Sequence, residues 1–383
     1  MNPNSFSLRG VVALLAIVIW ATVAWRLWDD GQRLVPLFAI GTSIGYTLYR
    51  ARFGFGAAYR RLLLDRQTEA VSAQLLMIAV ATLLFAPLLA HADGSYTGAW
   101  APAGVQVAVG AFLFGIGMQL GGGCGSGTLY TAGGGSLRMW LVLSAFCGGS
   151  FFATEHLGWW QQLPGQSTRV LGQLLGWWPA TLLQVGLLAL LFAGLQRWRR
   201  PAPKQSPYQP GRTLLAAAVM LALLNLATLL VAGHPWTITW AFSLWGAKAA
   251  TLVGWEPASG GFWAGDFQAQ ALQSPILEDQ TSVMNIGIVL GAAGAAIWHR
   301  GKVTLGGNQP RQWIAALIGG LIMGYGARIA YGCNIGAFFS GIASGSLHGW
   351  LWIALALPGN WVGIGLRPWF GLSNSAPVDG RSP

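Results

Sequence analysis

The stretch GGGCGSGTLYTAGGG, residues 121–135, follows directly on a hydrophobic run and contains eight glycines and one cysteine, Cys124. Glycine gives up more backbone freedom on folding than any other residue, so this density of glycine disfavours a stable α-helix. Non-helical backbone at membrane depth is tolerated only where protein buries it or where it lines a water-filled space. If the surrounding chain lies in a membrane, the stretch predicts a re-entrant loop that faces an internal cavity or pathway.

The composition of the whole chain indicates a membrane protein. Hydrophobic residues make up 54% of the 383 residues and charged residues only 9%, whereas about a quarter of the residues of a soluble protein are charged. Apolar runs close to the roughly 20 residues that cross a bilayer recur along the whole length. We therefore expect an all-α polytopic membrane protein with about 9–11 hydrophobic segments. The candidate segments are residues 11–28, 34–50, 71–90, 102–120, 137–154, 178–196, 213–232, 236–255, 283–299, 312–331 and 347–366.

The net charge of +11 is concentrated in short segments that flank apolar runs. The positive-inside rule explains this distribution, which favours a multi-pass protein of the inner (cytoplasmic) membrane in contact with lipid and argues against nucleic acid as a partner. Basic segments also create a favourable field for an anionic solute. Two basic segments contain Arg50, Arg52, Arg60, Arg61 and Arg66 in the first and Arg197, Arg199, Arg200, Lys204 and Arg212 in the second. A third basic segment, residues 299–302, favours the cytoplasm as well. The three segments cannot all be cytoplasmic if every hydrophobic segment crosses fully.

An internal repeat relates the two halves of the chain. Aligning Cys124 with Cys333, an offset of 209, superposes GAFLFGIGMQLGGGCGSG (110–127) on GGLIMGYGARIAYGCNIG (319–336). One inserted residue later, Ser136 aligns with Ser346. Paired repeats with interrupted segments in corresponding positions mark a transporter's binding site. We expect two pseudo-symmetric halves, each with a Gly/Cys re-entrant loop, and we favour an inverted arrangement over a parallel one.

A Pro-rich, basic segment near the middle of the chain separates the two repeats. The first hydrophobic run has no small-residue cleavage site after it, so it is expected to stay as a helix. The expected division is an extra N-terminal helix and loop (1–33), a first transmembrane repeat (34–196), a cytoplasmic linker (197–212), a second transmembrane repeat (213–370) and a flexible C-terminal tail (371–383).

The two repeated cysteines, Cys124 and Cys333, lie in the glycine stretches and are the strongest candidates for function. The three cysteines exclude a complete disulfide framework and show no paired metal-ligand spacing, so no metal or cofactor is expected. Uncovered backbone N–H groups and helix N-termini can hold an anion. A neutral thiol adds a weak S–H donor and a polarizable sulfur, which suit a soft sulfur oxyanion. Cys147 lies on an apolar run and is expected to be a packing residue.

Glycine and polar residues beside the cysteines complete the predicted pathway. Arg328 lies at the end of an apolar segment, where a charge is a functional candidate, with snorkelling to the interface as the alternative. Arg138 and His348 coincide under the repeat and either attract the anion or anchor the helix at the interface. The expected pathway residues are Cys124, Cys333, Gly123, Gly125, Gly127, Gly332, Gly336, Asn334 and Arg328.

Three motifs, ARFGFGAAYRR (51–61), GGGCGSGTLY (121–130) and GARIAYGCNIGAFFSGIASGSLHGW (326–350), resemble those of the YeeE/YedE family of membrane proteins. The resemblance extends from about residue 40 to residue 365. It implies an hourglass-like fold with pseudo-symmetric halves and uptake of thiosulfate that cysteine thiols pass along by hydrogen bonding. It also implies cooperation with a small soluble sulfur carrier of the TusA type. The family motif usually has a cysteine where this chain has Gly54, so Gly54 joins the pathway residues through its backbone amide.

The leading prediction is an integral membrane permease or channel for uptake of a small sulfur-containing anion, most simply thiosulfate, and not an enzyme. The alternatives are a membrane-embedded sulfurtransferase with a persulfide-forming cysteine, a transporter of a related sulfur or selenium compound, and a structural subunit. No His, Asp or Glu lies in either glycine stretch to serve as a base, which disfavours the sulfurtransferase. No Walker motif is present, so nothing indicates ATP hydrolysis by this chain.

Overall fold

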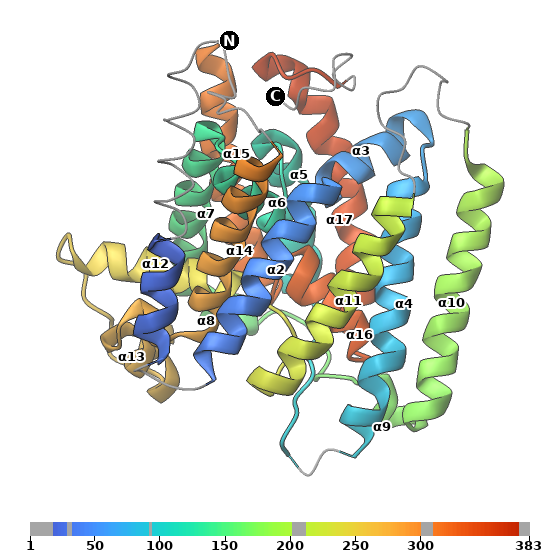
Figure 1. Ribbon diagram of the computed structural model, residues 1–383, viewed down its shortest axis with the longest axis horizontal. Helices are drawn as coiled ribbons and strands as arrows, with labels where there is room; N and C mark the ends of the chain where they lie inside the picture. The colour runs from blue at the N-terminus through green and yellow to red at the C-terminus, as the bar shows by residue number, and fades with distance from the viewer. Residues whose placement is uncertain (1–17, 29–32, 92–93, 201–211, 300–308, 375–383) are drawn as a thin grey trace.

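The computed structural model describes residues 18–28, 33–91, 94–200, 212–299 and 309–374. The described residues confirm the all-α class, because their only strand-like pairings are two isolated bridges, between Gly104 and Gly165 and between Val170 and Ser346. The long helices stand side by side in one bundle, and shorter helices lie at its ends (Figure 1). Most of the predicted linker (201–211), of the C-terminal tail (375–383) and of the extra N-terminal helix (1–17) lies outside the described residues.

The helices of the described residues occur in the following order. A helical stretch over 18–28 comes first. The elements after it are α2 (Leu34–Ala51), α3 (Phe55–Asp65), α4 (Glu69–Ala90), α5 (Val105–Gly121), α6 (Gly125–Gly133), α7 (Leu137–Glu155), α8 (Leu157–Gln161), α9 (Leu171–Leu175), α10 (Trp177–Trp198), α11 (Arg212–Ala232), α12 (Thr239–Thr251), η1 (Phe262–Ala264), α13 (Asp266–Gln273), η2 (Ile276–Glu278), α14 (Gln280–Trp298), α15 (Pro310–Ile329), η3 (Asn334–Ser340), α16 (Gly341–Ala343), α17 (Leu347–Leu366) and η4 (Arg367–Phe370).

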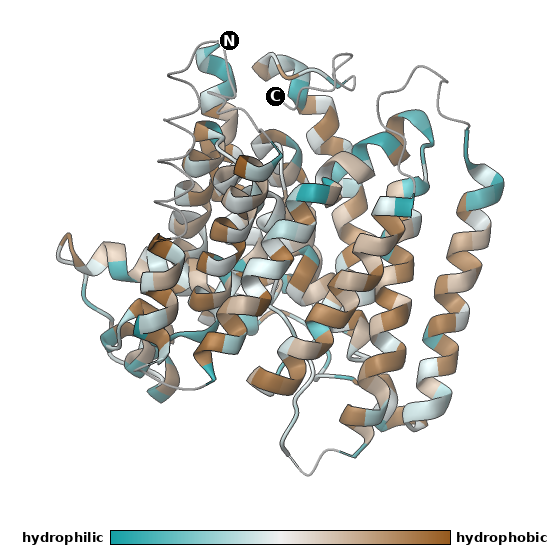
Figure 2. Cartoon of the chain, in the orientation of Figure 1, coloured by the Kyte–Doolittle hydropathy of each residue, from teal (hydrophilic) through white to brown (hydrophobic). Residues whose placement is uncertain are grey.

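Seven helices of the described residues are long and apolar enough to cross a bilayer, and an eighth span results if α15 and Asn334–Ala343, which meet at 42°, count as one. Figure 2 shows that these helices are apolar over most of their length and that polar residues gather at their ends. Two of the expected hydrophobic segments do not qualify. The helix α12 has 13 residues, so it reaches only about 20 Å, short of the hydrocarbon core of about 30 Å. The helix α2 is long enough but less apolar.

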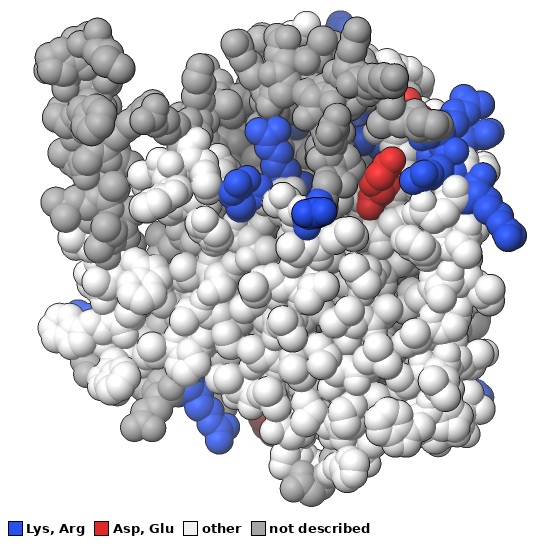
Figure 3. Space-filling model, turned by 45° about the vertical axis from the view of Figure 1, so that its right-hand side comes forward, with Lys and Arg blue, Asp and Glu red and all other residues white. Residues whose placement is uncertain are grey.

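The basic segments lie together at one end of the bundle. The C-terminal end of α2, α3 and the C-terminal end of α10 meet there (Figure 1), and the backbone N–H of Arg200 donates to the carbonyl oxygen of Arg66 at 3.1 Å. Figure 3 shows arginine and lysine side chains gathered at this end above a largely uncharged surface. The end of α14 lies at the same end, since the ring centroids of Tyr46 and His299 are 6.3 Å apart. The three basic segments agree because α12 is too short to cross.

The helices α5 and α15 cross as antiparallel helices with glycine against glycine. A Cβ atom added to Gly110 would lie 2.6 Å from the carbonyl oxygen of Gly326, and one added to Gly117 would lie 2.7 Å from that of Gly319. Only glycine permits backbones to approach this closely within a membrane. Under the offset of 209, Gly110 and Gly117 align with Gly319 and Gly326. Each of the two contacts is therefore the repeat image of the other.

The outer helices of the same group pack in equivalent ways. Gly324 of α15 lies against the carbonyl oxygen of Phe146 in α7, and Gly115 of α5 lies against that of Ala356 in α17. Residues 115 and 324 correspond under the offset of 209, and residues 146 and 356 correspond under the offset of 210 that follows the insertion. Around this group, α2 packs along α14, while α4 packs against α10 and α11.

Each repeated cysteine lies at a break in a helical segment. The helix α5 ends at Gly121 with Gly122 in the left-handed region, at φ 85°, and Cys124 precedes α6. The helix α15 ends at Ile329, and Cys333 precedes η3, a π-helix of seven residues. A π-helical turn accommodates one residue more than an α-helical turn. The π-helix η3 lies where the repeat offset changes from 209 to 210, so it accommodates the inserted residue of the second half.

Candidate functional site

Cys124 caps the N-terminus of α6. Its backbone is extended, and its Sγ accepts a hydrogen bond from the backbone N–H of Gly127 at 3.3 Å. The Oγ of Ser126 lies 3.4 Å from the same sulfur. The side chain is only 1% exposed. Since the sulfur accepts from the helix N-terminus, its S–H can donate to Ser126 or to a ligand.

Cys333 has the same local role in the second half. Its backbone is extended, and its Sγ accepts a hydrogen bond from the backbone N–H of Ile335 at 3.4 Å, at the start of η3. The side chain is 0% exposed. Both repeated thiols are thus N-caps with sulfur in place of the usual oxygen acceptor.

The fold brings the two glycine stretches together. A Cβ atom added to Gly125, the residue after Cys124, would lie 3.2 Å from the Sγ of Cys333. The backbone of one stretch therefore touches the thiol of the other, although the cysteines are 209 positions apart in the sequence. Any side chain at Gly125 would enter the space beside the Cys333 sulfur.

The other predicted glycines also lie against the two caps. Gly332 has φ of +153°, a conformation that favours glycine. In the first stretch, a Cβ atom added to Gly127 would lie 3.2 Å from the Sγ of Cys124, and one added to Gly123 would lie 3.4 Å from the backbone N of Thr128. In the second stretch, a Cβ atom added to Gly332 would lie 2.7 Å from the backbone N of Ala337, and one added to Gly336 would lie 3.2 Å from the Oγ1 of Thr237.

Asn334 lies at the same place, and its side chain is incompletely satisfied. It is fully buried; its Nδ2 lies 3.5 Å from the hydroxyl oxygen of Tyr59, and its Oδ1 has no partner among the described residues. The buried Oγ1 of Thr128 also has no partner there. Buried polar atoms are nearly always hydrogen-bonded, so two such atoms beside the cysteines mark a place that accommodates a polar ligand or water.

Tyr59, on α3, is a site residue that the sequence reasoning missed. It is 1% exposed, and burial raises the pKa of its hydroxyl, so the group stays protonated and can donate. The only sequence signal for it was its position within the motif ARFGFGAAYRR (51–61). Gly54 caps the same helix, and a Cβ atom there would lie 3.2 Å from the hydroxyl oxygen of Tyr130 on α6.

A cluster of aromatic rings belongs to the same buried core as the two cysteines, and a Cβ atom added to Gly125 would lie 3.7 Å from the ring of Phe146. The rings of Phe114 and Phe146 are 6.2 Å apart, and the ring of Trp352 lies 5.4 Å from that of Phe114. Phe338 stacks on Trp352 at 6.3 Å and contacts Phe55 at 6.4 Å. Both thiols are buried within this core.

Two predicted residues have contacts away from the cysteines. The guanidinium of Arg328 lies 4.3 Å from the ring centroid of Phe262, and its buried Nε has no hydrogen-bond partner among the described residues. The structure therefore does not bring Arg328 against Cys333, five positions further along the chain. Cys147 lies on α7, where its carbonyl oxygen faces Gly246 of α12 in a close helix contact. This contact agrees with a packing role.

A group of arginines that the sequence reasoning did not assemble surrounds the end of α5. Arg138 donates to the carbonyl oxygen of Gly121 at 3.3 Å, and Arg367 donates to that of Gln119 at 2.6 Å. Arg60, on α3, donates to the side-chain oxygen of Gln119 at 3.2 Å. Burial, with a smaller contribution from neighbouring Arg61, lowers the pKa of Arg60 to about 10, so its guanidinium is still charged at neutral pH. His348, the repeat equivalent of Arg138, instead lies 2.7 Å from the Oγ of Ser346.

Gln119 joins three elements at this place. Its Nε2 donates to the carbonyl oxygen of Gly56 at 2.9 Å and to the Oδ1 of Asn360 at 2.6 Å. Its Oε1 accepts from Arg60. The side chain therefore fixes α3 and α17 against the end of α5 and holds the Arg60 guanidinium in place.

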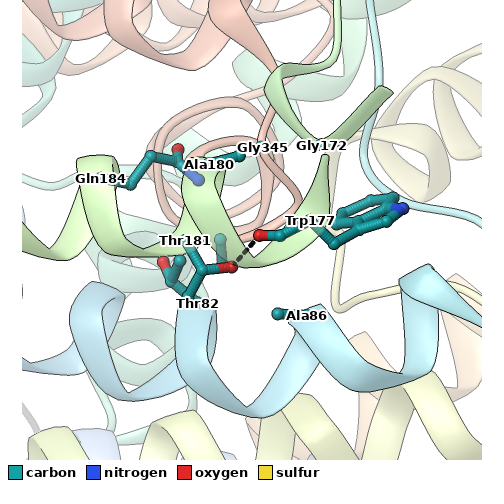
Figure 4. A pocket seen from close by; sticks show the side chains of 9 residues that line it. Thr82, Ala86, Gly172, Trp177, Ala180, Thr181, Gln184 and Gly345 are labelled. Atoms are coloured by element: carbon teal, nitrogen blue, oxygen red, sulfur yellow. Dashed lines mark hydrogen bonds between the residues drawn. The ribbon is translucent and has the colours of Figure 1, made fainter. Parts of the chain in front are cut away.

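Two pockets lie away from the arginines. One has a volume of about 210 Å³ and lies beside Tyr331, whose hydroxyl accepts a hydrogen bond from Gln106 at 2.6 Å; Gln161, Gln166 and Ser167 also line it. The other lies between α4 and α10, where Thr181 donates to the carbonyl oxygen of Trp177 (Figure 4). It is too tight for a water-sized sphere, so it is no site for an anion.

The chemistry of the donors does not favour a metal. Within the described residues, no group of three or more His, Cys, Asp or Glu side chains is arranged to hold an ion. The donors that do converge are thiols, hydroxyls, amides and guanidinium groups. Such donors recognise anions and neutral polar groups.

Comparison with known proteins agrees with this chemistry. Residues 50–362 match the family described as sulphur transport. The thiosulfate transporter TsuA of Spirochaeta thermophila is 30% identical over 337 residues, which cover 84% of this chain and 95% of the relative. The thiosulfate transporter TsuA of Escherichia coli is 25% identical over 338 residues, covering 84% of this chain and 91% of the relative. The probable transporter YedE of Escherichia coli is 33% identical over 152 residues, covering 39% of this chain and 36% of the relative.

The matched region includes both cysteine breaks, the motif around Gly54, and Arg60 and Arg138. The family and the relatives are named as transporters and not as enzymes. The chain is therefore a multi-pass membrane transporter that belongs to the sulphur transport family, the YeeE/YedE family that its motifs resemble.

Proposed function

We propose that this protein takes up thiosulfate through a path in which the thiols of Cys333 and Cys124 pass the anion along by hydrogen bonding. The observation that carries the proposal is the contact between Gly125 and the Sγ of Cys333, which joins the two thiol-capped breaks at one buried place. The names of the relatives that cover most of this chain support thiosulfate as the substrate.

The thiols suit this anion as neutral donors. A thiolate would repel an anion, whereas an S–H group donates to an oxygen or to a terminal sulfur and a polarizable sulfur matches a soft solute. Each sulfur already accepts a backbone N–H, from Gly127 or from Ile335, so its own hydrogen remains to be donated. The Asn334 amide N–H groups and the hydroxyl of Tyr59 supply further donors beside the thiols.

We further propose that the chain consists of two pseudo-symmetric, inverted halves. The contacts Gly110–Gly326 and Gly117–Gly319 exchange with each other under the repeat, which is the pattern of a two-fold axis. The antiparallel crossing of α5 and α15 supports an axis in the membrane plane, as inverted-repeat transporters have. The boundaries at 34–196 and 213–370 follow from this division, and each half contributes one thiol.

The membrane is proposed to be the inner membrane, with the basic end of the bundle in the cytoplasm. The side chains gathered at this end in Figure 3 support this orientation through the positive-inside rule. A soluble sulfur carrier of the TusA type would then receive the anion at this end. Such a carrier would have to present acidic side chains, since the surface that it meets is basic.

Uptake of radiolabelled thiosulfate into cells that lack other uptake routes tests the thiol path. Cys124→Ser and Cys333→Ser should each lower uptake about tenfold or more, because a soft donor is replaced by a hard hydroxyl at a buried contact. Cys147→Ser serves as the control, since Cys147 packs against α12, and it should keep uptake within about twofold. Normal uptake by a folded Cys124→Ser, Cys333→Ser double variant would contradict the thiol path.

The presence of glycine instead of cysteine at position 54 favours a second substrate class, a related sulfur or selenium compound. The family motif usually carries a cysteine there, and the structure instead has the hydroxyl of Tyr130 beside that position. Competition of labelled thiosulfate with unlabelled sulfite, sulfate and selenium analogues decides between these substrates. Competition by a selenium analogue at lower concentration than by thiosulfate itself would favour the second class.

A further inference from the structure

Three arginines from three separate elements converge on the last turn of α5. Arg60 comes from α3, Arg138 from the first turn of α7 and Arg367 from the end of α17. Each of the three donates a hydrogen bond to Gln119 or Gly121 of α5. Arg138 and Arg367 are only 4% and 6% exposed, whereas Arg60 is half-buried and belongs to α3, which lies at the basic end of the bundle.

The charge of this group is not balanced by protein. The end of a helix carries a partial negative charge of about half a unit, and three guanidinium groups face it. None of the three makes an ion pair with a described carboxylate, and the exposed Asp65 acts on Arg60 only from a distance. Three unit charges against about half a unit of negative charge leave roughly two and a half positive charges for a ligand.

The guanidinium groups also keep donors available. Within the described residues, Arg60 and Arg138 each donate a single hydrogen bond, both to α5, although a guanidinium has five N–H donors. Arg367 is tied at three nitrogens, to Gln119, Ser373 and Asn374, and is the fixed member of the group. A guanidinium fork matches the oxygens of an oxyanion in two parallel hydrogen bonds.

The group lies beside the break that holds Cys124. Arg138 packs against Gly122, two residues before Cys124. Arg60 follows one and a half turns after Gly54, the position where the family motif carries a cysteine. The same helix, α3, therefore carries both Arg60 and the position where the family motif has its third thiol.

We propose that Arg60, Arg138 and Arg367 form a binding site for a small divalent oxyanion at the inner end of the path, after the last thiol. The site recognises the oxygens of the anion by charge, whereas Cys124 and Cys333 recognise the soft sulfur. It deepens the proposed function and rests on it for the identity of the anion as thiosulfate. Because it has no thiol, it also binds sulfate.

Equilibrium binding to the purified Cys124→Ser, Cys333→Ser protein tests the site without its thiols. Titration calorimetry in detergent at low salt should show one saturable site for thiosulfate and for sulfate. Addition of Arg60→Gln should weaken both affinities about tenfold or more, the effect of one lost charge-assisted hydrogen bond. Arg50→Gln removes an exposed arginine from the same end of the bundle and should leave both affinities unchanged.

Arg138→Lys is the control for a folding defect, because lysine keeps the positive charge but loses the paired N–H donors of the guanidinium. It should weaken anion binding less than Arg138→Gln does, and both variants should keep the melting temperature of the parent protein. Absence of saturable binding in the double cysteine variant would overturn the site. Equal binding after Arg60→Gln would overturn it as well. Displacement of sulfate by added phosphatidylglycerol at equimolar lipid would assign the arginines to a lipid headgroup and would also overturn it.

These outcomes are independent of transport. Normal thiosulfate uptake by the double cysteine variant contradicts the thiol path and leaves the arginine site to its own titration. Saturable binding that depends on Arg60 in a protein that does not take up thiosulfate supports the site and contradicts the proposed substrate.

Discussion

Gly110 of α5 and Gly326 of α15 meet backbone to backbone, and a Cβ atom added to either residue would lie 2.6 or 2.5 Å from the carbonyl oxygen of the other. Gly117 and Gly319 make the equivalent contact two turns away, at 2.7 and 2.9 Å. These contacts set the spacing of the two helices that end at the cysteine breaks. The relative position of the two thiols therefore depends on four glycines.

Alanine at Gly110 or Gly326 should lower thermal stability, because the neighbouring atom is backbone and cannot turn aside. Overpacking of this kind costs about 1–3 kcal/mol. Gly117→Ala and Gly319→Ala should lower the melting temperature by similar amounts, since their contacts are the repeat images. Thermal unfolding of the detergent-purified variants, followed by size-exclusion chromatography, measures the loss.

The matched controls are Gly186→Ala and Gly194→Ala on α10, where an added Cβ atom meets nothing within 4 Å. Alanine is favoured over glycine by about 1 kcal/mol in a helix, so these variants should melt at or above the wild-type temperature. A loss at Gly186 as large as the loss at Gly110 would contradict the packing explanation, because an alanine at Gly186 meets no neighbouring atom.

The repeat alignment singles out the glycines of the α5–α15 crossing but not which of them touch, and hydropathy overestimates the number of membrane crossings. The repeat alignment pairs Gly110 with Gly319 and Gly117 with Gly326, and the structure places these four residues at one crossing. The run 236–255 is apolar enough to suggest a span, yet α12 begins only at Thr239 and ends at Thr251. Hydropathy depends on composition alone and does not show where a helix begins and ends, so it overestimates the length of this segment.

The arginine group could not be predicted from the sequence. Arg60, Arg138 and Arg367 lie far apart in the chain and share no motif. Arg60 belongs to a basic segment, Arg138 is expected only to attract the anion or to anchor a helix, and no pattern singles out Arg367. Only the packing of α3, α7 and α17 around Gln119 brings them together. Tyr59 was missed for the same reason, because its contact with Asn334 joins residues 275 positions apart.

Gly125→Ala should impair transport more than stability. The residue is the first of α6, where alanine suits the helix, but its Cβ atom would lie 3.2 Å from the Sγ of Cys333 and occupy the space between the two caps. Thiosulfate uptake should fall about tenfold or more, the effect of one lost buried contact with the anion. The melting temperature of Gly125→Ala should fall by less than the melting temperature of Gly110→Ala does.

Gly148→Ala on α7 is the control for Gly125→Ala, since its nearest neighbour would be a leucine methyl group at 3.8 Å, an ordinary contact. It should leave both uptake and stability near the wild-type values. Wild-type uptake by Gly125→Ala would mean that the anion does not pass between Gly125 and Cys333.

Substitution of either cysteine should distinguish its role as a helix cap, measured by stability, from its role in transport, measured by uptake. Serine is a preferred N-cap residue, so Cys124→Ser and Cys333→Ser should melt at or above the wild-type temperature. Cys124→Ala leaves the N–H of Gly127 without its acceptor and should destabilise the protein by about 1 kcal/mol. All three variants should lose uptake. A serine variant that melts well below the alanine variant would contradict the capping role.

Charge at Asn334 should block the path, while loss of the Tyr59 hydroxyl should only weaken it. Asn334→Asp places a carboxylate at a fully buried position and repels the anion, so uptake should fall about a hundredfold or more. Tyr59→Phe removes one neutral donor and should lower the apparent affinity about three- to tenfold. Initial rates over a range of thiosulfate concentrations separate the two effects. Equal uptake by Asn334→Asp and wild type would place the anion elsewhere.

The pH dependence of anion binding at the arginine group follows from the pKa of Arg60. Burial, with a smaller contribution from Arg61, lowers this pKa to about 10, while Asp65 acts in the opposite direction. The charged form, which binds the anion, predominates below the pKa. Sulfate affinity of the Cys124→Ser, Cys333→Ser protein should therefore be constant from about pH 6 to about pH 8 and fall as the pH rises toward and through about 10. Calorimetric titrations at each pH, with Arg60→Gln as the control, measure this. A decline centred between about pH 6 and pH 8 would assign the binding to a histidine instead, since histidine alone among unperturbed side chains titrates there.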